Sequence, residues 1–245
     1  MTGPAPAKIN LALVVGARRE DGKHELVTVF QRLDLGDRVT VEPAHRTSVD
    51  GFREDTIVQR ALALLEAPHG WRVRIDKRVP VAAGLGGGSS DAATALRLAN
   101  GQLAQPLPGG RLHELAASVG ADVPFFLREG PQLGTGDGTG LEPLDLPQDY
   151  GVLVLLPAGA RKQSTAAVYA RFDERGGADG FAERAAALRT VLAAELRAHG
   201  AFRADVSGAG PALYGLFNRT ADAKRAARAL GHLGRIWITV PAWYG

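Results

Sequence analysis

A glycine-rich stretch that runs directly into an alanine-rich one, over residues 80–94, is the feature that most constrains how this chain folds. Four glycines fall within five residues, and Ser89 and Ser90 precede residues 91–105, whose apolar spacing predicts a helix. We expect both serine hydroxyls to cap the N-terminus of that helix. Glycine lets backbone N–H groups converge on an anion, and a helix N-terminus adds unpaired donors and partial positive charge. The stretch therefore predicts a phosphate-binding loop formed by Pro80, Ala82, Gly84, Leu85, Gly86, Gly87, Gly88, Ser89 and Ser90.

The alternative for this stretch is a flexible connector before an ordinary helix. A connector rarely includes an apolar residue such as Leu85 and seldom leads straight into a capped apolar helix, so the phosphate loop is favoured. The stretch is not a Walker A loop, because the chain has no Gly-Lys-Ser/Thr sequence, and it is not a G-x-G-x-x-G dinucleotide-binding turn. By itself the stretch predicts a phosphate-binding site and does not identify the ligand that carries the phosphate.

Composition narrows the class of function. Cysteine is absent, which excludes disulfides, a thiolate zinc site and a cysteine nucleophile, and makes the cytoplasm the expected compartment. The net charge is only +3 and the basic residues are spread along the chain, so we expect no nucleic-acid partner. No apolar run approaches the roughly 18 residues of a membrane span, so we expect no membrane partner. The histidines stand singly, which predicts no metal held by the protein itself.

The apolar periodicity predicts an α+β protein with a strand-rich N-terminal half. Glycine and proline crowd residues 134–149, where the periodicity lapses, which predicts a boundary between domains at 1–145 and 146–245. A ligand cleft between the two is expected, because small-molecule sites favour domain interfaces. The predicted strands are residues 9–15, 25–33, 38–42, 71–76, 152–156, 204–207 and 212–217, and the predicted helices are residues 56–66, 91–105, 111–119, 164–172, 180–199 and 221–230.

Two further segments complete a pattern with the glycine-rich stretch. Residues 6–13 (PAKINLAL) place a lysine inside an apolar strand, and residues 206–212 (VSGAGPA) place a second glycine-rich turn between two apolar strands. In this order and spacing the three segments resemble the three motifs of the GHMP kinase superfamily. Residues 19–26, 120–125 and 164–169 make the chain similar to the branch that phosphorylates a cytidine-diphospho sugar alcohol in non-mevalonate isoprenoid biosynthesis.

This resemblance implies a two-lobed α+β fold, with an N-terminal lobe like domain 2 of ribosomal protein S5 and a C-terminal α/β sandwich. It implies ATP as the co-substrate, in the cleft between the lobes, and transfer of its terminal phosphoryl group to the tertiary 2-hydroxyl of the sugar alcohol. Mg²⁺ would accompany ATP, held mostly by phosphate oxygens and water. A small-molecule substrate is the expected partner, and a monomer or a weak homodimer is the expected state.

The resemblance assigns the catalytic roles to Lys8 and Asp122. Asp122 would lie beside the attacking hydroxyl, and Lys8 would keep that carboxylate ionised and meet developing charge. Whether Asp122 takes the proton or only orients the hydroxyl stays open. Without the motifs, Asp122 is as well explained as a turn aspartate, and Lys8 as a strand-edge lysine that guards against aggregation.

The remaining assignments concern the acceptor substrate. The resemblance implies that Asn10 orients it, that His24 contacts the cytosine edge, and that Thr165 lies near it. Tyr169 would stack on the base, whereas Lys23 stands where the family usually has a second aromatic residue. We expect Lys23 to compensate by laying its alkyl stem on the base and placing its ammonium near the diphosphate.

The third segment and the exact activity leave alternatives. Ser207, Gly208 and Gly210 either contact phosphate, brace the first loop, or form a tight turn between strands. A homoserine or mevalonate kinase is the rival within the superfamily, and residues 21–26 (DGKHEL) argue against it. A catalytically silent nucleotide-binding protein is the rival of a different class, and retention of both Lys8 and Asp122 disfavours it.

Overall fold

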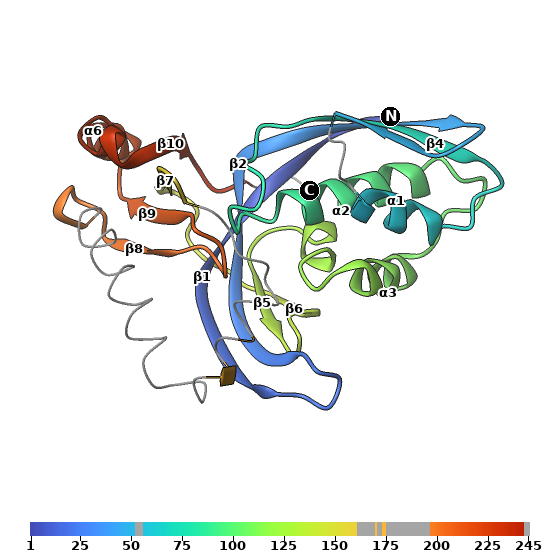
Figure 1. The fold of residues 1–245 in the computed structure, drawn as a ribbon, viewed down its shortest axis with the longest axis horizontal. Coiled ribbons are helices and arrows are strands. Elements are labelled where there is room, and N and C mark those ends of the chain that lie inside the picture. Colours follow the sequence, from blue (N-terminus) through green and yellow to red (C-terminus); the bar gives the residue numbers. More distant parts are fainter. Residues whose placement is uncertain (52–55, 161–169, 171–172, 175–196, 243–245) are drawn as a thin grey trace.

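The computed structural model describes residues 1–51, 56–160, 170, 173–174 and 197–242, and within them it contains two β-sheets with helices packed on both (Figure 1). The first sheet has the strand order β3-β4-β2-β5-β6, and β1 also pairs with β2; the second has the order β10-β7-β9-β8. The first sheet comprises β1 (Thr2–Arg18), β2 (His24–Ala44), β3 (Ser48–Asp50), β4 (Gly70–Asp76), β5 (Gln132–Thr135) and β6 (Gly140–Pro143). The second comprises β7 (Gly151–Pro157), β8 (Arg203–Val206), β9 (Leu213–Phe217) and β10 (Gly234–Thr239). The described helices are α1 (Thr56–Ala63), α2 (Gly87–Asn100), α3 (Gly109–Val119) and α6 (Thr220–Leu230), with 3₁₀ turns η1 (Pro124–Leu127) and η2 (Gly231–Leu233).

The antiparallel pair of β1 and β2 is the longest feature of the fold. Register shifts interrupt it after Pro6, after Asn10 and after Val15. Bulges of this kind bend a strand and redirect its side chains, and they are common beside active sites. Beyond the pair, β2 hydrogen-bonds to β5 along its first part and to β4 along its last part. One strand thus connects the remote hairpin tip with the main body of the sheet.

Helices α1 and α2 pack against the first sheet, and α3 packs against α1, α2 and η1 on the same side (Figure 1). Along β4, Trp71, Val73 and Ile75 are buried and alternate with exposed residues, as expected for a strand with one face in a core. The alanines of α2, among them Ala92 and Ala95, are fully buried in the same core. Small side chains let α2 pack close to the sheet, which fixes the position of the helix N-terminus.

The central strands of the second sheet, β7 and β9, are buried on both faces. In β7, Val152 and Val154 belong to one hydrophobic cluster, whereas Leu153 and Leu155 belong to another that includes α6. Because strand side chains alternate between faces, an uninterrupted apolar run is what a strand covered on both sides requires. Helix α6 therefore covers one face, and the first sheet covers the other.

The two sheets share a hydrophobic core. Ile9 of β1 and Leu33 of β2 lie in one cluster with Leu85, Val154 and Tyr214, and each of these side chains is almost completely buried. An isolated bridge between Leu33 and Pro241 adds a backbone contact between the halves of the chain. The cleft described below therefore lies between parts that pack firmly against each other.

The structure corrects several predictions about elements. Residues 25–33 and 38–42 belong to one continuous strand, β2, because the chain crosses Gly36 without leaving the sheet. Strands β5 and β6 occupy the segment where a boundary is predicted; both are too short and glycine-rich to show periodicity, and pairing with β2 stabilises them. The predicted helices at 164–172 and 180–199 lie outside the described residues, apart from a few positions.

The proposed division at 145/146 stays a prediction, although β6 ends the first sheet at Pro143 and β7 starts the second at Gly151. The sequence patterns do not predict strand β10, because most of its residues are half-buried and they do not alternate between buried and exposed. None of the described helices combines the length and the apolar character needed to cross a membrane.

The shared core predicts a clear contrast between two positions on β1. Ile9 is fully buried between the sheets, whereas Val14 is 64% exposed on the same strand. Ile9→Ala should lower the free energy of unfolding by about 2–5 kcal/mol, because it leaves a cavity in the core. Val14→Ala, the matched control, should change it by no more than about 0.5 kcal/mol. Urea denaturation followed by circular dichroism measures both, and equal effects would contradict the shared core.

Candidate active site

A cleft of about 820 Å³ lies where the first sheet, the glycine-rich loop and the turn between β8 and β9 meet. Its volume is in the range of small-molecule sites. Most of the residues predicted for the site line it. Those are Lys8, Asn10, Lys23, His24, Pro80, Ala82, Gly84, Leu85, Gly86, Gly87, Gly88, Ser89, Asp122, Gly208 and Gly210.

The phosphate loop, residues 80–90, is held by three consecutive backbone carbonyls. The carbonyl of Ala83 accepts a hydrogen bond from the backbone N–H of Ala212 (3.1 Å), and that of Gly84 accepts one from the Ser207 hydroxyl (2.9 Å). The carbonyl of Leu85 accepts one from the backbone N–H of Lys8 (2.9 Å). The three segments that the sequence analysis singles out therefore meet at this loop.

Two glycines allow this contact. Gly84 has a φ of +85°, and a Cβ built there would lie 2.4 Å from the carbonyl oxygen of Ser207. A Cβ at Gly210 would lie 2.2 Å from the carbonyl oxygen of Ala83. The backbones of the two loops thus approach more closely than any side chain permits. Among the alternatives for the third segment, bracing the first loop is therefore what its geometry provides, within a tight turn between β8 and β9.

The start of α2 differs from the prediction. The helix begins at Gly87 and its N-cap is Gly86, so Ser89 and Ser90 lie inside the first turn and neither caps it. Gly86 has a φ of +70°, which lets the chain enter the helix earlier than the serines predict. Ser89 lines the cleft, whereas Ser90 is fully buried and its hydroxyl has no hydrogen-bond partner within the described part of the chain.

Lys8 and Asp122 form an ion pair in the cleft. The Lys8 Nζ lies 3.3 Å from the Asp122 Oδ2; the lysine side chain is 5% exposed, and the aspartate is 37% exposed. Asp122 stands in the turn between α3 and η1, so a carboxylate from the helical layer meets a cation from β1. The Lys8 Nζ also lies 5.5 Å from the centre of the Phe30 ring. A buried cation therefore faces a carboxylate that the cleft leaves accessible.

Asn10 is occupied with holding Lys8. Its Oδ1 accepts a hydrogen bond from the Lys8 Nζ (2.7 Å), and its Nδ2 donates to the Thr28 hydroxyl (2.7 Å), which donates to the carbonyl of Ala12 (2.8 Å). The third segment completes this arrangement, because a Cβ at Gly208 would lie 3.0 Å from the Asn10 Oδ1. The predicted contact of Asn10 with the substrate stays a prediction, and its positioning of Lys8 is an addition.

A second buried cluster supports the other side of the phosphate loop. The Lys77 Nζ donates to Asp37 (2.6 Å) and to Asp91 (2.7 Å), and both carboxylate side chains are fully buried. Burial lowers the pKa of Lys77, but the charges and hydrogen bonds of Asp91 and Asp37 outweigh this effect and raise the pKa overall. Asp37 also accepts the backbone N–H of Val79 (2.8 Å), which fixes the approach to the loop. No local sequence pattern predicts this cluster, because its members are far apart in the chain.

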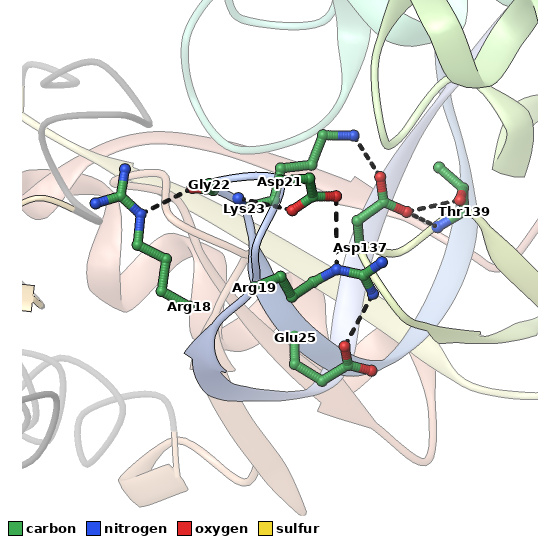
Figure 2. Close-up of polar contacts among 8 residues, drawn as sticks. All are labelled: Arg18, Arg19, Asp21, Gly22, Lys23, Glu25, Asp137 and Thr139. Carbon is green, nitrogen blue, oxygen red and sulfur yellow. Dashed lines mark hydrogen bonds and ion pairs between the residues drawn. The ribbon is translucent and has the colours of Figure 1, made fainter.

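The hairpin tip between β1 and β2, residues 18–24, contributes Arg18, Gly22, Lys23 and His24 to the lining of the cleft. Figure 2 shows the polar contacts of this tip. The Lys23 Nζ lies 2.5 Å from the Asp137 Oδ2, and Asp137 also accepts the Thr139 hydroxyl (2.6 Å). Burial raises the pKa of Asp137, but the hydrogen bonds from Lys23 and Thr139 outweigh it and lower the pKa overall. The ammonium of Lys23 is therefore held by a carboxylate. Contact of its alkyl stem with a base, and of its ammonium with a diphosphate, both stay predictions.

His24 is held in a similar way. Its Nε2 lies 2.7 Å from the Oδ1 of Asp173, and the ring is nearly buried beneath the cleft surface. Asp173 lines the cleft and was missed, although it follows Tyr169 by four residues in a segment with a helical pattern. The predicted substrate residues Thr165 and Tyr169 lie outside the described residues.

Comparisons with known proteins agree with this geometry. The family model of the GHMP kinases N-terminal domain matches residues 56–130, and that of the GHMP kinases C-terminal domain matches residues 187–236. The chain is 35% identical to the 4-diphosphocytidyl-2-C-methyl-D-erythritol kinase of Salinibacter ruber, over 92% of this chain and 93% of that protein. The chain belongs to the GHMP kinase family. The predicted family and fold class of this GHMP kinase are thereby confirmed.

Two further comparisons place it within the family. A crystal structure of 4-(cytidine 5′-diphospho)-2C-methyl-D-erythritol kinase has a TM-score of 0.82 and 35% sequence identity, over 99% of both chains. The 4-diphosphocytidyl-2-C-methyl-D-erythritol kinase of Burkholderia thailandensis is 44% identical over 61% of this chain and 55% of that protein. The match thus spans just over half the length of the Burkholderia relative and nearly all of the Salinibacter relative.

The glycine at position 86 generates a prediction about this GHMP kinase. A Cβ there would lie 2.9 Å from both the Lys8 Cγ and the Phe126 Cζ, at a φ that alanine adopts only with strain. Gly86→Ala should weaken ATP binding by roughly tenfold or more, because strain of about 1–2 kcal/mol and a displaced Lys8 both disturb the loop.

Gly110→Ala serves as the matched control, because a Cβ at Gly110 of α3 would meet nothing within 4 Å. Isothermal titration with ATP, beside melting curves of both variants, gives the comparison. Unchanged ATP affinity in a folded Gly86→Ala protein would mean that this glycine has no part in the nucleotide site.

Proposed function

We propose that this protein phosphorylates the 2-hydroxyl of 4-diphosphocytidyl-2-C-methyl-D-erythritol with ATP, giving the 2-phosphate and ADP, in the non-mevalonate route to isoprenoid precursors. The observation that carries the proposal is the Lys8–Asp122 pair at 3.3 Å, in one cleft with a braced phosphate loop. Family membership and similarity to kinases of that name support the choice of substrate. The cytoplasmic location and the monomeric or weakly dimeric state stay predictions.

The loop fits the phosphates of ATP. The first intrahelical bond of α2 runs from the N–H of Ser90 to the carbonyl of Gly86, so the N–H groups of Gly87, Gly88 and Ser89 need acceptors from outside the helix. A phosphate supplies such acceptors and is favoured by the partial positive charge of a helix N-terminus. Lys77 also lines the cleft here, with its Nζ 3.2 Å from the position of a Cβ at Gly87.

Mg²⁺ would enter with ATP. The described residues contain no group of three or more histidine, aspartate or glutamate side chains that could hold a metal ion. Mg²⁺ keeps several waters and binds readily through substrate phosphates. Its contribution when bound is to neutralise charge on the transferred phosphoryl group.

The ion pair suits the transfer step. The acceptor hydroxyl oxygen forms a bond to the terminal phosphorus of ATP, the bond from that phosphorus to the bridging oxygen breaks, and ADP leaves. Asp122 orients the hydroxyl and is placed to accept its proton, while Lys8 offsets the negative charge that develops nearby. Phosphoryl transfer needs little more than such positioning and charge stabilisation.

The buried surroundings make Lys8 a fixed charge. Asn10, Phe30 and Asp122 surround its ammonium, so it needs little reorganisation when the reaction occurs. A silent nucleotide-binding protein would have no use for a buried lysine aimed at an accessible carboxylate. The retained pair therefore favours an enzyme over a binding protein.

Removal of either member of the pair should slow the reaction. Asp122→Asn and Lys8→Ala should each lower kcat by about a hundredfold or more, because orientation and charge stabilisation are lost, while ATP binding changes little. Asp149→Asn and Lys224→Ala make the same changes at exposed positions and should leave kcat unchanged. Steady-state kinetics with ATP titrations measure both quantities. A near-normal kcat in either cleft variant would remove that residue from the mechanism.

Turnover of a substrate panel tests the acceptor. ADP release should occur with 4-diphosphocytidyl-2-C-methyl-D-erythritol and not with homoserine or mevalonate, because those acceptors lack the cytidine diphosphate part that we expect to contact Lys23 and His24 in the cleft lining. The coupled assay uses Mg-ATP, with the Asp122→Asn variant as the background. Turnover of homoserine or mevalonate as fast as that of the cytidine-diphospho acceptor, or faster, would contradict the proposed substrate.

A further inference from the structure

The bulge in β1 at Leu11 decides which side chains of that strand face the cleft. Asn10 and Ala12 lie opposite consecutive residues of β2, so Leu11 is an extra residue in the pairing. Lys8 and Asn10 line the cleft before the bulge, and Leu13 lines it afterwards. In a regular strand the side chains of residues 10 and 13 would face opposite sides, because successive side chains alternate. The extra residue therefore lets both parts of β1 contribute to the cleft.

The second sheet holds this extra residue in place. The carbonyl oxygen of Leu11 accepts hydrogen bonds from the Arg203 Nη2 (2.5 Å) and from the Tyr214 hydroxyl (3.3 Å). Arg203 is the exposed first residue of β8, whereas Tyr214 lies in β9 and is fully buried in the core between the sheets. Burial raises the pKa of Tyr214 despite an opposing hydrogen bond from Arg203, so the phenol keeps the proton that it donates. Two donors from the second sheet thus fix the backbone of β1 at its bulge.

A short series of hydrogen bonds leads from the bulge to Lys8. The next carbonyl, that of Ala12, accepts the Thr28 hydroxyl (2.8 Å), which in turn accepts the Asn10 Nδ2 (2.7 Å). The Asn10 Oδ1 accepts the Lys8 Nζ (2.7 Å), and this ammonium faces Asp122. Thr28, Asn10 and Lys8 are each no more than 5% exposed, so water offers them few other partners. A displacement of the bulge would therefore move the Lys8 ammonium.

We propose that Arg203 and Tyr214 are positioning residues for phosphoryl transfer, and that they act through the β1 bulge on Lys8. The inference deepens the proposed function and rests on it for the reaction that Lys8 serves. Neither residue is among the described residues that line the cleft, so neither is expected to touch ATP or the acceptor. Transfer depends on placement, and a displacement of about 1 Å can cost roughly a hundredfold in rate. The second sheet thus contributes to the reaction as well as to the core.

Removal of each donor tests the proposal. Tyr214→Phe removes only the hydroxyl and keeps the ring in the core, and Arg203→Gln removes the guanidinium. Each should lower kcat roughly three- to tenfold, and the double variant roughly tenfold or more, while the KM for ATP changes little. Arg203→Lys should recover part of the loss, because lysine retains a charged donor. Steady-state kinetics with Mg-ATP and 4-diphosphocytidyl-2-C-methyl-D-erythritol measure these effects.

Two matched controls separate positioning from stability. The Tyr150 hydroxyl also makes a 3.3 Å hydrogen bond, to Gln31, and its ring packs on the same hydrophobic cluster as Tyr214. Arg197 also donates to a backbone carbonyl, that of Ala204 in β8. Tyr150→Phe and Arg197→Gln should therefore keep kcat, whatever they do to the melting temperature. If kcat falls in all four single variants in proportion to the melting temperature, the contacts to Leu11 are merely structural and the inference is wrong.

The route through Asn10 has a test of its own. In an Asn10→Ala background the last link to Lys8 is already lost, so Tyr214→Phe and Arg203→Gln should lower kcat no further. In the wild-type background both should lower it. Equal losses in the two backgrounds would mean that neither residue acts through Asn10, and would overturn the inference.

A readout without turnover separates this inference from the proposed function. The chain has five lysines, so few signals arise in the NMR spectrum of protein with ¹³C-labelled lysine, and Lys8→Ala identifies the Lys8 signal. The Arg203→Gln, Tyr214→Phe double variant should shift the Lys8 signal and leave that of Lys77 in place. If the shift occurs but the wild type fails to turn over the cytidine-diphospho substrate, the acceptor is wrong and the positioning role stands. If turnover is normal and the double variant changes neither kcat nor the Lys8 signal, the positioning role is wrong and the proposed function stands.

Discussion

Three adjacent backbone carbonyls, those of Ala83, Gly84 and Leu85, determine the shape of the cleft. Each accepts a hydrogen bond from a different partner: Ala212, Ser207 and Lys8. One residue after them, Gly86 turns the chain into α2, so the same constraint that fixes the loop also aims the helix N-terminus. The contact further sets Lys8, whose N–H is tied to the loop and whose ammonium faces Asp122. The same hydrogen bonds thus position both the phosphate loop and the Lys8–Asp122 pair.

The charged side chains of the cleft are stabilised by partners of opposite charge. Taking a lysine such as Lys8 or Lys77 out of water is costly unless a carboxylate and hydrogen bonds accompany it, and here both are present. The carboxylate partners also restrict what these lysines can bind, because a ligand must compete with the carboxylate for the ammonium group. Arg18 also lines the cleft and has no carboxylate partner among the described residues, so it is not subject to the same competition.

Sequence patterns predict this molecule well where a residue type has one physical explanation. Clustered glycines before an alanine-rich helix predict the phosphate loop, and the structure places Gly84 and Gly86 at positive φ. The serine caps are wrong, because hydroxyl preference is local whereas the helix start is decided by Gly86. Lys77 and Asp137 could not be found, since each acquires its role only when distant strands and turns meet. Motif resemblance locates Asp122, which local pattern alone leaves as a turn residue.

The hairpin tip shows how one change in sequence can redistribute roles in a shared fold. Lysine at position 23 places an ammonium beside Asp137, and the ion pair ties the tip to the β5–β6 turn. An aromatic residue could not form that pair, so here the tip is anchored by charge. Its turn also needs Gly22 at positive φ, beside which the Arg18 guanidinium lies. The Lys23–Asp137 pair therefore holds the ends of β1 and β2 against the β5–β6 turn, and with them the position of Arg18 in the lining of the cleft.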